Sequence, residues 1–368
     1  PREEQKEIVY SSLIIKRTID TKKGQLILDA GEELAEDKTV EKYNMKSIIT
    51  VPLATSNKLL GVIYLDNRQV KGLFTTENFE LLKAFAIEAS ISIENAKLYE
   101  QVQEKARMEQ EMEIAKDIQT SILPSVEDTG SYKMAAYMRT ATEVGGDYYD
   151  FYMQESPYFG VFGDVSGHGL KSGLVMMMAE VAFNTLMTDQ NIKNQPLESL
   201  YQKINSTLFK NIQKRLAKKS KMGSQYNHMY MTFRIFRFDD DGDFEMFGND
   251  HAMPFVCRTG SGEIEAIDST GFLIGIIPDV KMNNNGYKFK LNKDDLLILY
   301  SDGITEARGK KNENKTKRTM YGEERLYETV KLNRDKEPNE IIKCVLASLD
   351  EWMLEQDDDI TIAIIKKT

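Results

Sequence analysis

Four short acidic motifs hold the residues best suited to catalysis, each at the end of an apolar run or in a glycine-rich turn. They are Glu143–Asp150, Gly163–Gly169, Ser301–Gly303 and Asp357–Asp359. Glycine lets the backbone pass close by while a neighbouring aspartate holds its carboxylate in a cleft. Converging carboxylates repel one another unless a cation neutralises them, and oxygen-only ligand sets suit Mg²⁺ or Mn²⁺. The spacing predicts a metal site for phosphoryl or hydrolytic chemistry, with solvated turns as the alternative.

A fifth acidic run illustrates that alternative. Asp239–Asp243 lacks the spacing of an EF-hand loop, and it separates the strand-like runs Phe233–Phe238 and Phe244–Phe247. We interpret it as a hairpin turn. Zinc is disfavoured throughout, because the chain has three histidines and neither a CxxC nor an HExxH motif.

The elements around these motifs fall into three regions. Before residue 76, the runs Gln25–Leu28, Ser47–Leu53 and Leu60–Leu65 predict strands. From Leu73 to Leu123 there is neither glycine nor proline, so a helix capped by Thr75 or Thr76 and ended by Pro124 is expected. After Pro124 the pattern predicts many strands with two helical stretches, which are Leu170–Met187 and Leu197–Leu216.

The long helix carries apolar residues at steps of three and four. They are Ala96, Tyr99, Val102, Ala106, Met112, Ala115, Ile118 and Ile122. Charged residues lie between them, which is typical of an amphipathic helix. Two interpretations stay open: a coiled-coil-like linker that pairs two chains into a homodimer, or a helix packed along its own domain.

Composition excludes several classes of protein. With 48 basic and 58 acidic residues the formal net charge is −10, which argues against nucleic acid as a partner. The two cysteines, Cys257 and Cys344, form no CxxC pair, so we expect a cytoplasmic protein without a disulfide framework. No leader or apolar run of membrane-spanning length is present, so no membrane association is predicted. Because residue 1 is Pro rather than Met, we also expect sequence upstream of it.

The ordered series of motifs resembles a known enzyme family. Val144–Asp150, Gly163–Gly169, Ser301–Ala307 and Asp358–Thr361 look like the motifs of PPM (protein phosphatase 2C-like) metal-dependent serine/threonine phosphatases. The similarity is to the bacterial branch typified by the sporulation stage-II-E and sigma-B-regulator phosphatases, and Ala115–Pro124 resembles the helix that leads into that domain. The resemblance implies an α+β fold over residues 125–368: two stacked antiparallel sheets, a β-sandwich, flanked by helices.

The same resemblance implies the site and its chemistry. The implied metal ligands are Asp147, Asp164, the backbone carbonyl of Val165, Asp302 and Asp358, with Asp150 and Asp359 as further candidates. Asp164 would bridge two Mn²⁺ or Mg²⁺ ions, Asp302 and Asp358 would ligate one of them, and Asp147 would support the other directly or through water. Two such ions, about 3.5–4 Å apart, acidify a water that attacks phosphorus directly, without a covalent phosphoenzyme.

Two positions depart from the pattern of the eukaryotic branch. There a histidine follows the bridging aspartate by two positions, whereas His168 follows Asp164 by four. His168 is therefore either the proton donor to the leaving oxygen or a residue that structures the turn. No arginine occupies the expected position of a phosphate clamp, and Arg139 is the candidate.

The N-terminal region resembles part of a GAF domain. The similarity covers about residues 8–100 and rests on Ser47–Leu53, Gly61–Asp66 and the stretch from Phe74 to Tyr99. We assign residues 1–97 to a partial GAF-like sensor domain without its opening helix and strands, and 98–124 to the helical linker. The resemblance implies either an unidentified small-molecule ligand or a structural role in dimerisation.

Together these features predict a protein serine/threonine phosphatase regulated through its GAF domain and linker. Resemblance to the sigma-regulating branch implies a phosphorylated STAS-type anti-sigma-factor antagonist as substrate. The alternative is a catalytically inactive phosphatase fold that acts as a regulatory binding module. Nucleotide binding by Gly167–Gly173 is a lesser rival, because Ser172 replaces the third glycine of GxGxxG. A cysteine phosphatase is excluded, since neither cysteine is followed six residues later by arginine.

Overall fold

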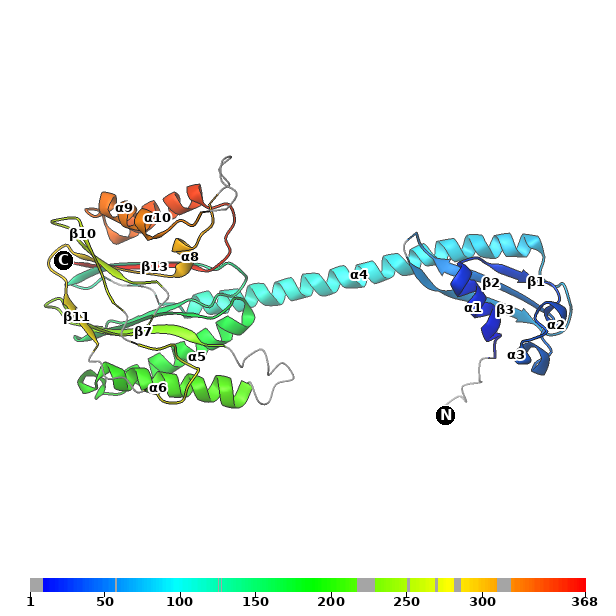
Figure 1. Cartoon of the computed structure of the whole chain (residues 1–368), viewed down its shortest axis with the longest axis horizontal. Helices are drawn as coiled ribbons and strands as arrows, with labels where there is room; N and C mark the ends of the chain where they lie inside the picture. Colours follow the sequence, from blue (N-terminus) through cyan, green and yellow to red (C-terminus); the bar gives the residue numbers. More distant parts are fainter. Residues whose placement is uncertain are drawn as a thin grey trace. The chain divides into compact units, whose positions relative to one another are not determined.

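The chain divides into two compact units, Pro1–Glu109 and Gln110–Thr368. The computed structural model describes residues 9–56, 58–124, 126, 128–216, 229–249, 252–268, 271–280, 286–309 and 319–368 (Figure 1). The boundary between the units falls inside the segment expected to be the linker. None of the helices in these ranges has the length and apolar character needed to span a membrane.

The first unit contains a small antiparallel sheet of order β1-β2-β3. Its elements are α1 (Ser12–Thr21), β1 (Gln25–Ile27), α2 (Ala30–Glu33), α3 (Lys38–Lys42), β2 (Ser47–Ala54) and β3 (Leu59–Asn67). Ile14 of α1, Val40 of α3 and Ile48 of β2 belong to one buried core. The three strands lie where the apolar runs predicted them.

The long helix α4 (Thr76–Ile122) begins with a side-chain cap. Thr75 Oγ1 accepts a hydrogen bond from the Asn78 backbone N–H at 3.2 Å, and Asn78 Oδ1 accepts from the Thr75 N–H at 3.0 Å. This reciprocal pair satisfies donors that a helix start leaves without partners. The helix ends two residues before Pro124, so the expected span of Leu73–Leu123 is confirmed within a few residues.

The second unit is a sandwich of two five-stranded antiparallel sheets, of order β10-β9-β12-β13-β4 and β11-β8-β7-β6-β5. The strands are β4 (Tyr132–Arg139), β5 (Tyr148–Tyr152), β6 (Tyr158–Val165), β7 (Met231–Phe238), β8 (Asp243–Asn249), β9 (Phe255–Arg258), β10 (Glu263–Ala266), β11 (Tyr287–Lys290), β12 (Leu296–Tyr300) and β13 (Ile360–Lys367). Apolar side chains of both sheets, such as Phe162 and Leu297, form the core between them. The predicted α+β sandwich is confirmed.

Helices cover the outer face of each sheet (Figure 1). One face packs on α5 (Leu170–Met187), the 3₁₀ turn Ile192–Asn194, α6 (Leu197–Phe209) and a π-helical turn (Lys210–Leu216). The other packs on α8 (Asp302–Thr305), α9 (Glu323–Asn333) and α10 (Pro338–Trp352). Strands such as β12 are buried on both faces, because a sheet or a helix layer covers each of them.

Two of these helices contradict the expectation of only two helical stretches after Pro124. The sequence reading missed α9 and α10. The signal for α10 was present, because Pro338 is suited to a first helical position and Ile341, Val345 and Leu349 recur at four-residue steps. The predicted hairpin was correct, since Phe238 pairs with Phe244 across Asp239–Asp243.

Candidate functional site

The four predicted aspartate motifs lie at strand ends on both sheets. Asp164 is the penultimate residue of β6, and Asp147 directly precedes β5, whose Tyr148 pairs with Gly163. Asp302 lies two residues after the end of β12, and Asp358 lies two residues before the start of β13. In the register of these two strands Tyr300 pairs with Ile362. Each sheet therefore brings two distant motifs to neighbouring strand ends.

Asp147 is where the two sheets meet. Its side chain is 1% exposed and accepts a hydrogen bond from the hydroxyl of Thr361, at 2.5 Å, in the opposite sheet. The Ser301 side chain, just after β12, also acts to lower its pKa. Burial raises the pKa of this carboxyl well above its usual value, and the nearby carboxylates of Asp164 and Asp359 raise it further. The structure thus crowds like charges from β6, β13 and the loop before β5 into a buried space, which is the arrangement that a cation stabilises.

Asp358 is the centre of a second group. Partial burial raises the pKa of this carboxyl, and the charges of Asp302 and Asp359 also raise it, whereas His168 lowers it. Asp358 itself remains exposed to solvent, and a Cβ on Gly303 would lie 3.4 Å from its carbonyl carbon, so the segment that carries Asp302 passes beside it. His168, four residues after Asp164, is exposed, so it faces solvent beside the carboxylates.

Asp359 uses both carboxylate oxygens to hold backbone. Oδ1 accepts from the Ala141 N–H at 2.7 Å, and Oδ2 accepts from the Gly146 N–H at 2.6 Å. Its side chain is buried, and the two backbone N–H groups occupy two of the roughly four acceptor sites of a carboxylate. These two hydrogen bonds by themselves indicate that Asp359 positions the loop before Asp147.

Glycine is required at Gly146, in the loop before Asp147, and at Gly303, after β12, because other atoms approach both positions closely. A Cβ on Gly146 would lie 2.9 Å from the Val165 carbonyl oxygen and 3.2 Å from Asp164 Oδ1. A Cβ on Gly303 would lie 2.0 Å from the Asp359 carbonyl oxygen. Any side chain at these positions would displace backbone that carries predicted ligands. The glycines quoted in the motifs thus have a physical role in bringing the aspartates together.

The donor set suits divalent cations that retain water. In the described ranges, no three acidic, histidine or cysteine side chains already stand close enough to hold a metal ion among themselves. Mg²⁺, however, is commonly bound through one or two carboxylates, with water supplying the other ligands. Asp147 with Asp164, and Asp302 with Asp358, are the pairs that could supply such carboxylates, because within each pair the charge of one residue raises the pKa of the other. The Val165 carbonyl lies against the loop before Asp147.

The remaining candidates lie elsewhere. Asp150 accepts hydrogen bonds from the Tyr148 hydroxyl at 3.0 Å and from Asn184 Nδ2 at 2.9 Å, so it joins β5 to α5. Arg139 forms an ion pair with Asp350 of α10 at 2.7 Å. Asp150 and Arg139 therefore each have a structural partner, and the contacts found for them include none of the predicted ligands.

Sequence reasoning missed three residues that support the site: Gln119, Ser301 and Thr361. Thr361 N–H donates to Ser301 Oγ at 3.0 Å, and Ser301 N–H donates to the Thr361 carbonyl at 2.9 Å. The Ser301 hydroxyl in turn donates to the Asp359 carbonyl at 3.0 Å, so the pairing of β12 and β13 fixes both side chains beside Asp147. Ser301 and Thr361 lie inside quoted motifs, so their positions were visible in the sequence, but their orientation depends on strand register.

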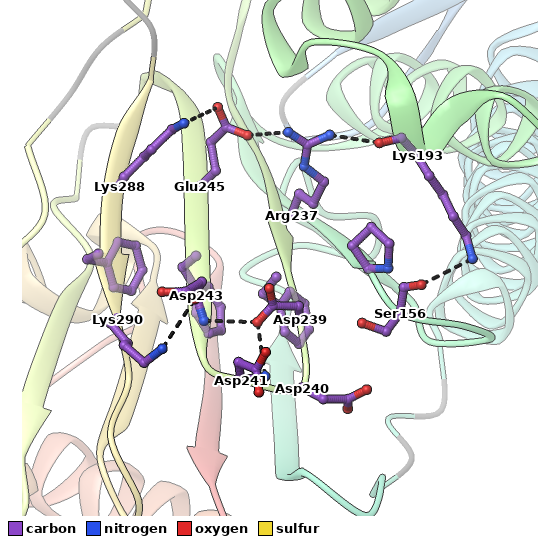
Figure 2. Close-up of a pocket in the computed structure, with 14 residues that line it drawn as sticks. Ser156, Lys193, Arg237, Asp239, Asp240, Asp241, Asp243, Glu245, Lys288 and Lys290 are labelled. Atoms are coloured by element: carbon purple, nitrogen blue, oxygen red, sulfur yellow. Dashed lines mark hydrogen bonds and ion pairs between the residues drawn. The ribbon is translucent and has the colours of Figure 1, made fainter.

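A large surface pocket lies on the β11-β8-β7-β6-β5 sheet, at the end opposite to Asp147 and Asp164 (Figure 2). It has a volume of about 890 Å³ and is lined by charged residues of the β7–β8 hairpin and β11. Arg237 and Lys288 both pair with Glu245, and Lys290 pairs with Asp243 at 3.2 Å. It lies about 20 Å from Asp164, because six residue steps of roughly 3.3 Å each separate Tyr158, at the start of β6, from Asp164. The charges there compensate one another, so this pocket is not the candidate metal site.

The comparisons with protein families divide the chain as its structure does. Residues 155–368 match the family described as stage II sporulation protein E, and residues 5–95 match the GAF domain family. The predicted GAF domain at the N-terminus is thereby confirmed. The first match covers more than half of the chain.

Individual relatives that align with most of this chain have low sequence identity to it. Protein IcfG of Synechocystis sp. is 24% identical over 277 residues, which cover 70% of this chain and 41% of IcfG. Phosphoserine phosphatase RsbU of Bacillus subtilis is 22% identical over 262 residues, covering 70% of each protein. Among solved structures, the PP2C domain of SiaA from Pseudomonas aeruginosa has a TM-score of 0.57 at 17% identity and covers 71% of this chain and 98% of that domain. This structural likeness shows that the fold is shared.

Proposed function

Because the chain belongs to the stage II sporulation protein E family of PP2C-type serine/threonine phosphatases, we propose that it is an active, metal-dependent protein phosphatase. The observation that carries this proposal is the convergence of strand-end aspartates from both sheets around the buried carboxylate of Asp147. Membership of the family confirms the resemblance found in the sequence. Activity, substrate and metal use of this particular chain remain the proposal.

Two Mn²⁺ or Mg²⁺ ions are the proposed cofactors. Asp164 and the Val165 carbonyl would hold them together with Asp147 on one side and Asp302 and Asp358 on the other. Bound divalent cations acidify a water molecule and neutralise charge on the phosphoryl oxygens. The crowding of like charges at Asp147 supports this assignment, since Asp147 is buried and the charges that raise its pKa are those of Asp164 and Asp359.

The chain's own residues would fix the geometry of the reaction. Asp359 holds the backbone of Gly146, and Thr361 holds the carboxylate of Asp147. These bonds orient the ligands before substrate arrives, which is the kind of preorganisation that catalysis by positioning requires. His168 faces solvent, and its charge lowers the pKa of Asp358, so it is our candidate for the residue that donates a proton to the leaving oxygen.

We propose a phosphorylated protein, rather than a small phosphoester, as substrate. Residues 271–280 lie beside the site, because Ile274 pairs with Met231, which in turn pairs with Val165. In this segment Phe272, Ile276 and Ile277 leave large apolar surfaces exposed. Exposed apolar side chains next to a polar site suit contact with a protein surface.

The α6 helix fixes the backbone of that segment. Tyr201 donates to the Phe272 carbonyl, and Asn205 Nδ2 donates to the Ile277 carbonyl at 3.0 Å. The apolar surface is therefore held in place before a partner binds. RsbU is a phosphoserine phosphatase by name, and our proposed substrate is likewise a phosphoserine or phosphothreonine on a small STAS-type anti-sigma-factor antagonist.

Regulation would pass through the GAF domain and α4. Tyr99, Val102 and Ile118 of the predicted apolar series are exposed along α4. Pairing of two chains through this series would bury them, which favours a homodimer over a helix covered by its own domain. The GAF domain would change this pairing by binding a small molecule or by pairing itself. Light scattering on the full chain and on a Val102→Glu variant tests the dimer, and equal monomeric masses would contradict it.

The phosphatase proposal is tested by hydrolysis of p-nitrophenyl phosphate and of a phosphoserine peptide. Wild type and Asp164→Asn would be assayed with Mn²⁺, with Mg²⁺ and with EDTA. We expect turnover by wild type that requires the metal and is lost in the variant. Mn²⁺ binding by wild type without turnover of either substrate would instead identify an inactive binding module.

A further inference from the structure

Gln119, in the last turn of α4, binds directly to the loop that carries Asp147. Its side chain is 1% exposed. Nε2 donates to the Gly145 carbonyl at 2.7 Å, and Oε1 accepts from the Gly145 N–H at 2.9 Å. A carboxamide has one donor side and one acceptor side, so it can satisfy the N–H and the C=O of one residue at once. Asparagine has the same carboxamide, but its side chain is one methylene shorter.

The loop is held between Gln119 and the predicted ligands. Gly145 has no space for a side chain, since a Cβ there would lie 2.6 Å from Asp359 Oδ2. The next residue, Gly146, donates to the same Asp359 oxygen and lies against the Val165 carbonyl and Asp164. Gln119 therefore binds one side of this backbone, and the other side faces Asp164 and Asp359. A displacement of Gly145 would move Asp147, two residues later.

The same point of contact includes the first turns of α5. A Cβ on Gly173 would lie 3.2 Å from the Gly145 carbonyl oxygen and 3.4 Å from Gln119 Nε2. The helix α5 begins directly after the Gly163–Gly169 motif that carries Asp164. Gln119 is thus located where α4, the loop before Asp147 and the helix after Asp164 touch one another.

We propose that Gln119 is a positioning residue for the metal site: its two hydrogen bonds hold Gly145–Asp147 in the place where Asp147 and Asp164 bind a divalent cation. This inference rests on the proposed function, because it assumes that these aspartates bind metal. It also gives α4 a direct contact with the site. A rotation or withdrawal of the last turns of α4 would break both bonds and lower metal affinity, without any change in the ligands themselves.

The test is Mn²⁺ binding to the full chain by isothermal titration calorimetry, together with the Mn²⁺ dependence of p-nitrophenyl phosphate hydrolysis. In Gln119→Leu we expect the dissociation constant and the half-saturating Mn²⁺ concentration to rise about tenfold or more, the range for loss of a residue that orients a ligand. Excess Mn²⁺ should restore most of kcat. Gln110→Leu is the matched control, because Gln110 is an exposed glutamine on the same helix and should leave both values unchanged.

A second variant covers the case in which Gln119→Leu fails to fold. Gln119→Glu keeps the size of the side chain and the acceptor for the Gly145 N–H, but it places an oxygen against the Gly145 carbonyl. It should also weaken Mn²⁺ binding, while thermal unfolding in EDTA verifies that the variant is folded. Wild-type Mn²⁺ affinity in a folded Gln119 variant would overturn the inference, even if its unfolding temperature were lower.

Failure of the proposed function gives a different result. If wild type binds no Mn²⁺ and hydrolyses neither substrate, then the metal-site assignment fails, and the role of Gln119 fails with it. If wild type binds Mn²⁺ and turns over, while Gln119→Leu matches it in both measurements, only the inference about Gln119 is wrong.

Discussion

Two groups of aspartates lie at opposite ends of the β5–β8 sheet, and their surroundings differ. At the Asp239–Asp243 turn the carboxylates are solvated, Asp243 pairs with Lys290, and Asp239 accepts from backbone N–H groups of its own turn. At the other end, Asp147 is buried, and the strongest charges acting on it are those of Asp164 and Asp359. Both regions are rich in Asp and Gly in the sequence.

The difference lies in what neutralises the charge. Water, lysine and arginine do so at the hairpin, and the pocket in Figure 2 is lined by such ion pairs. At Asp147 the groups that lower the pKa are hydroxyls of Thr361 and Ser301, which carry no charge. A buried carboxylate next to other carboxylates is costly unless a cation joins it. Burial beside like charges, more than the abundance of aspartate, therefore marks the candidate site.

The largest expected effect is on catalytic activity, which should depend on the aspartates around Asp147 and not on those of the hairpin. Asp147→Asn should reduce kcat/KM for p-nitrophenyl phosphate with Mn²⁺ by at least about 100-fold, because metal-based charge stabilisation is worth several kcal/mol. Asp243→Asn, at the hairpin, should change it by less than about twofold, since a surface charge far from the site contributes little. Steady-state kinetics of both variants measure this, and similar losses in the two would remove the distinction.

A smaller effect concerns stability. Asp359→Asn replaces one of two buried acceptors by a donor, leaving a backbone N–H of Ala141 or Gly146 without a partner, at a cost of about 1–3 kcal/mol. Asp239→Asn should cost less than about 0.5 kcal/mol, because a single oxygen of Asp239 accepts both backbone N–H groups of its exposed turn. Urea unfolding in EDTA compares them. A stable Asp359→Asn would mean that its backbone contacts are replaceable.

The smallest expected effect is on how the free energy of unfolding changes with pH. Burial raises the pKa of Asp150, so the native state retains this proton at pH values where the unfolded chain has lost it. Stability should therefore fall as pH rises from the ordinary carboxyl pKa through the raised one. The hydrogen bond from Lys193 lowers the pKa of Glu155, so its contribution is lost as pH falls through the lowered pKa and is complete above the ordinary one.

Variants isolate these two contributions. Asp150→Asn should remove a negative slope of unfolding free energy against pH, and Glu155→Gln should remove a small positive one. Urea unfolding at intervals between pH 3 and pH 7, in EDTA, gives both slopes. The slope is the quantity to compare, because Asp150→Asn also alters hydrogen bonds to Tyr148 and Asn184. Slopes of the same sign would mean that the two carboxylates have similar environments.

The sequence predicted local elements well where the pattern was strong. The helix α5 has the predicted ends, Leu170–Met187, and the aspartate motifs lie at strand ends as expected. Both follow from short-range signals, such as runs of apolar residues bounded by glycine. The missed helix α9 has charged residues over much of its surface and buries only Leu326 and Val330, so its apolar pattern is short.

Contacts across the sandwich were beyond the reach of sequence reasoning. Gln119 lies inside the stretch Ala115–Pro124 that was recognised as a lead-in helix, yet nothing in its spacing indicates a partner at Gly145. Asp359 illustrates the same limit, because adjacent aspartates at 358 and 359 have different roles only once the β13 register turns Asp359 toward Gly146. Such pairings depend on packing between segments about 25 to 210 residues apart, as their positions show.

The end of α4 also has a consequence for how such proteins can exchange parts during evolution. Gln119 is hydrogen-bonded to the β-sandwich of the second unit, and Leu123 packs against two of its cores. The last turns of the helix are thus inherited as part of the phosphatase. A recombination event that joins a new sensor upstream of Gln110 preserves these contacts, whereas a junction at Ser125 discards them. Functional fusions should therefore cluster at junctions before the final turns of the helix.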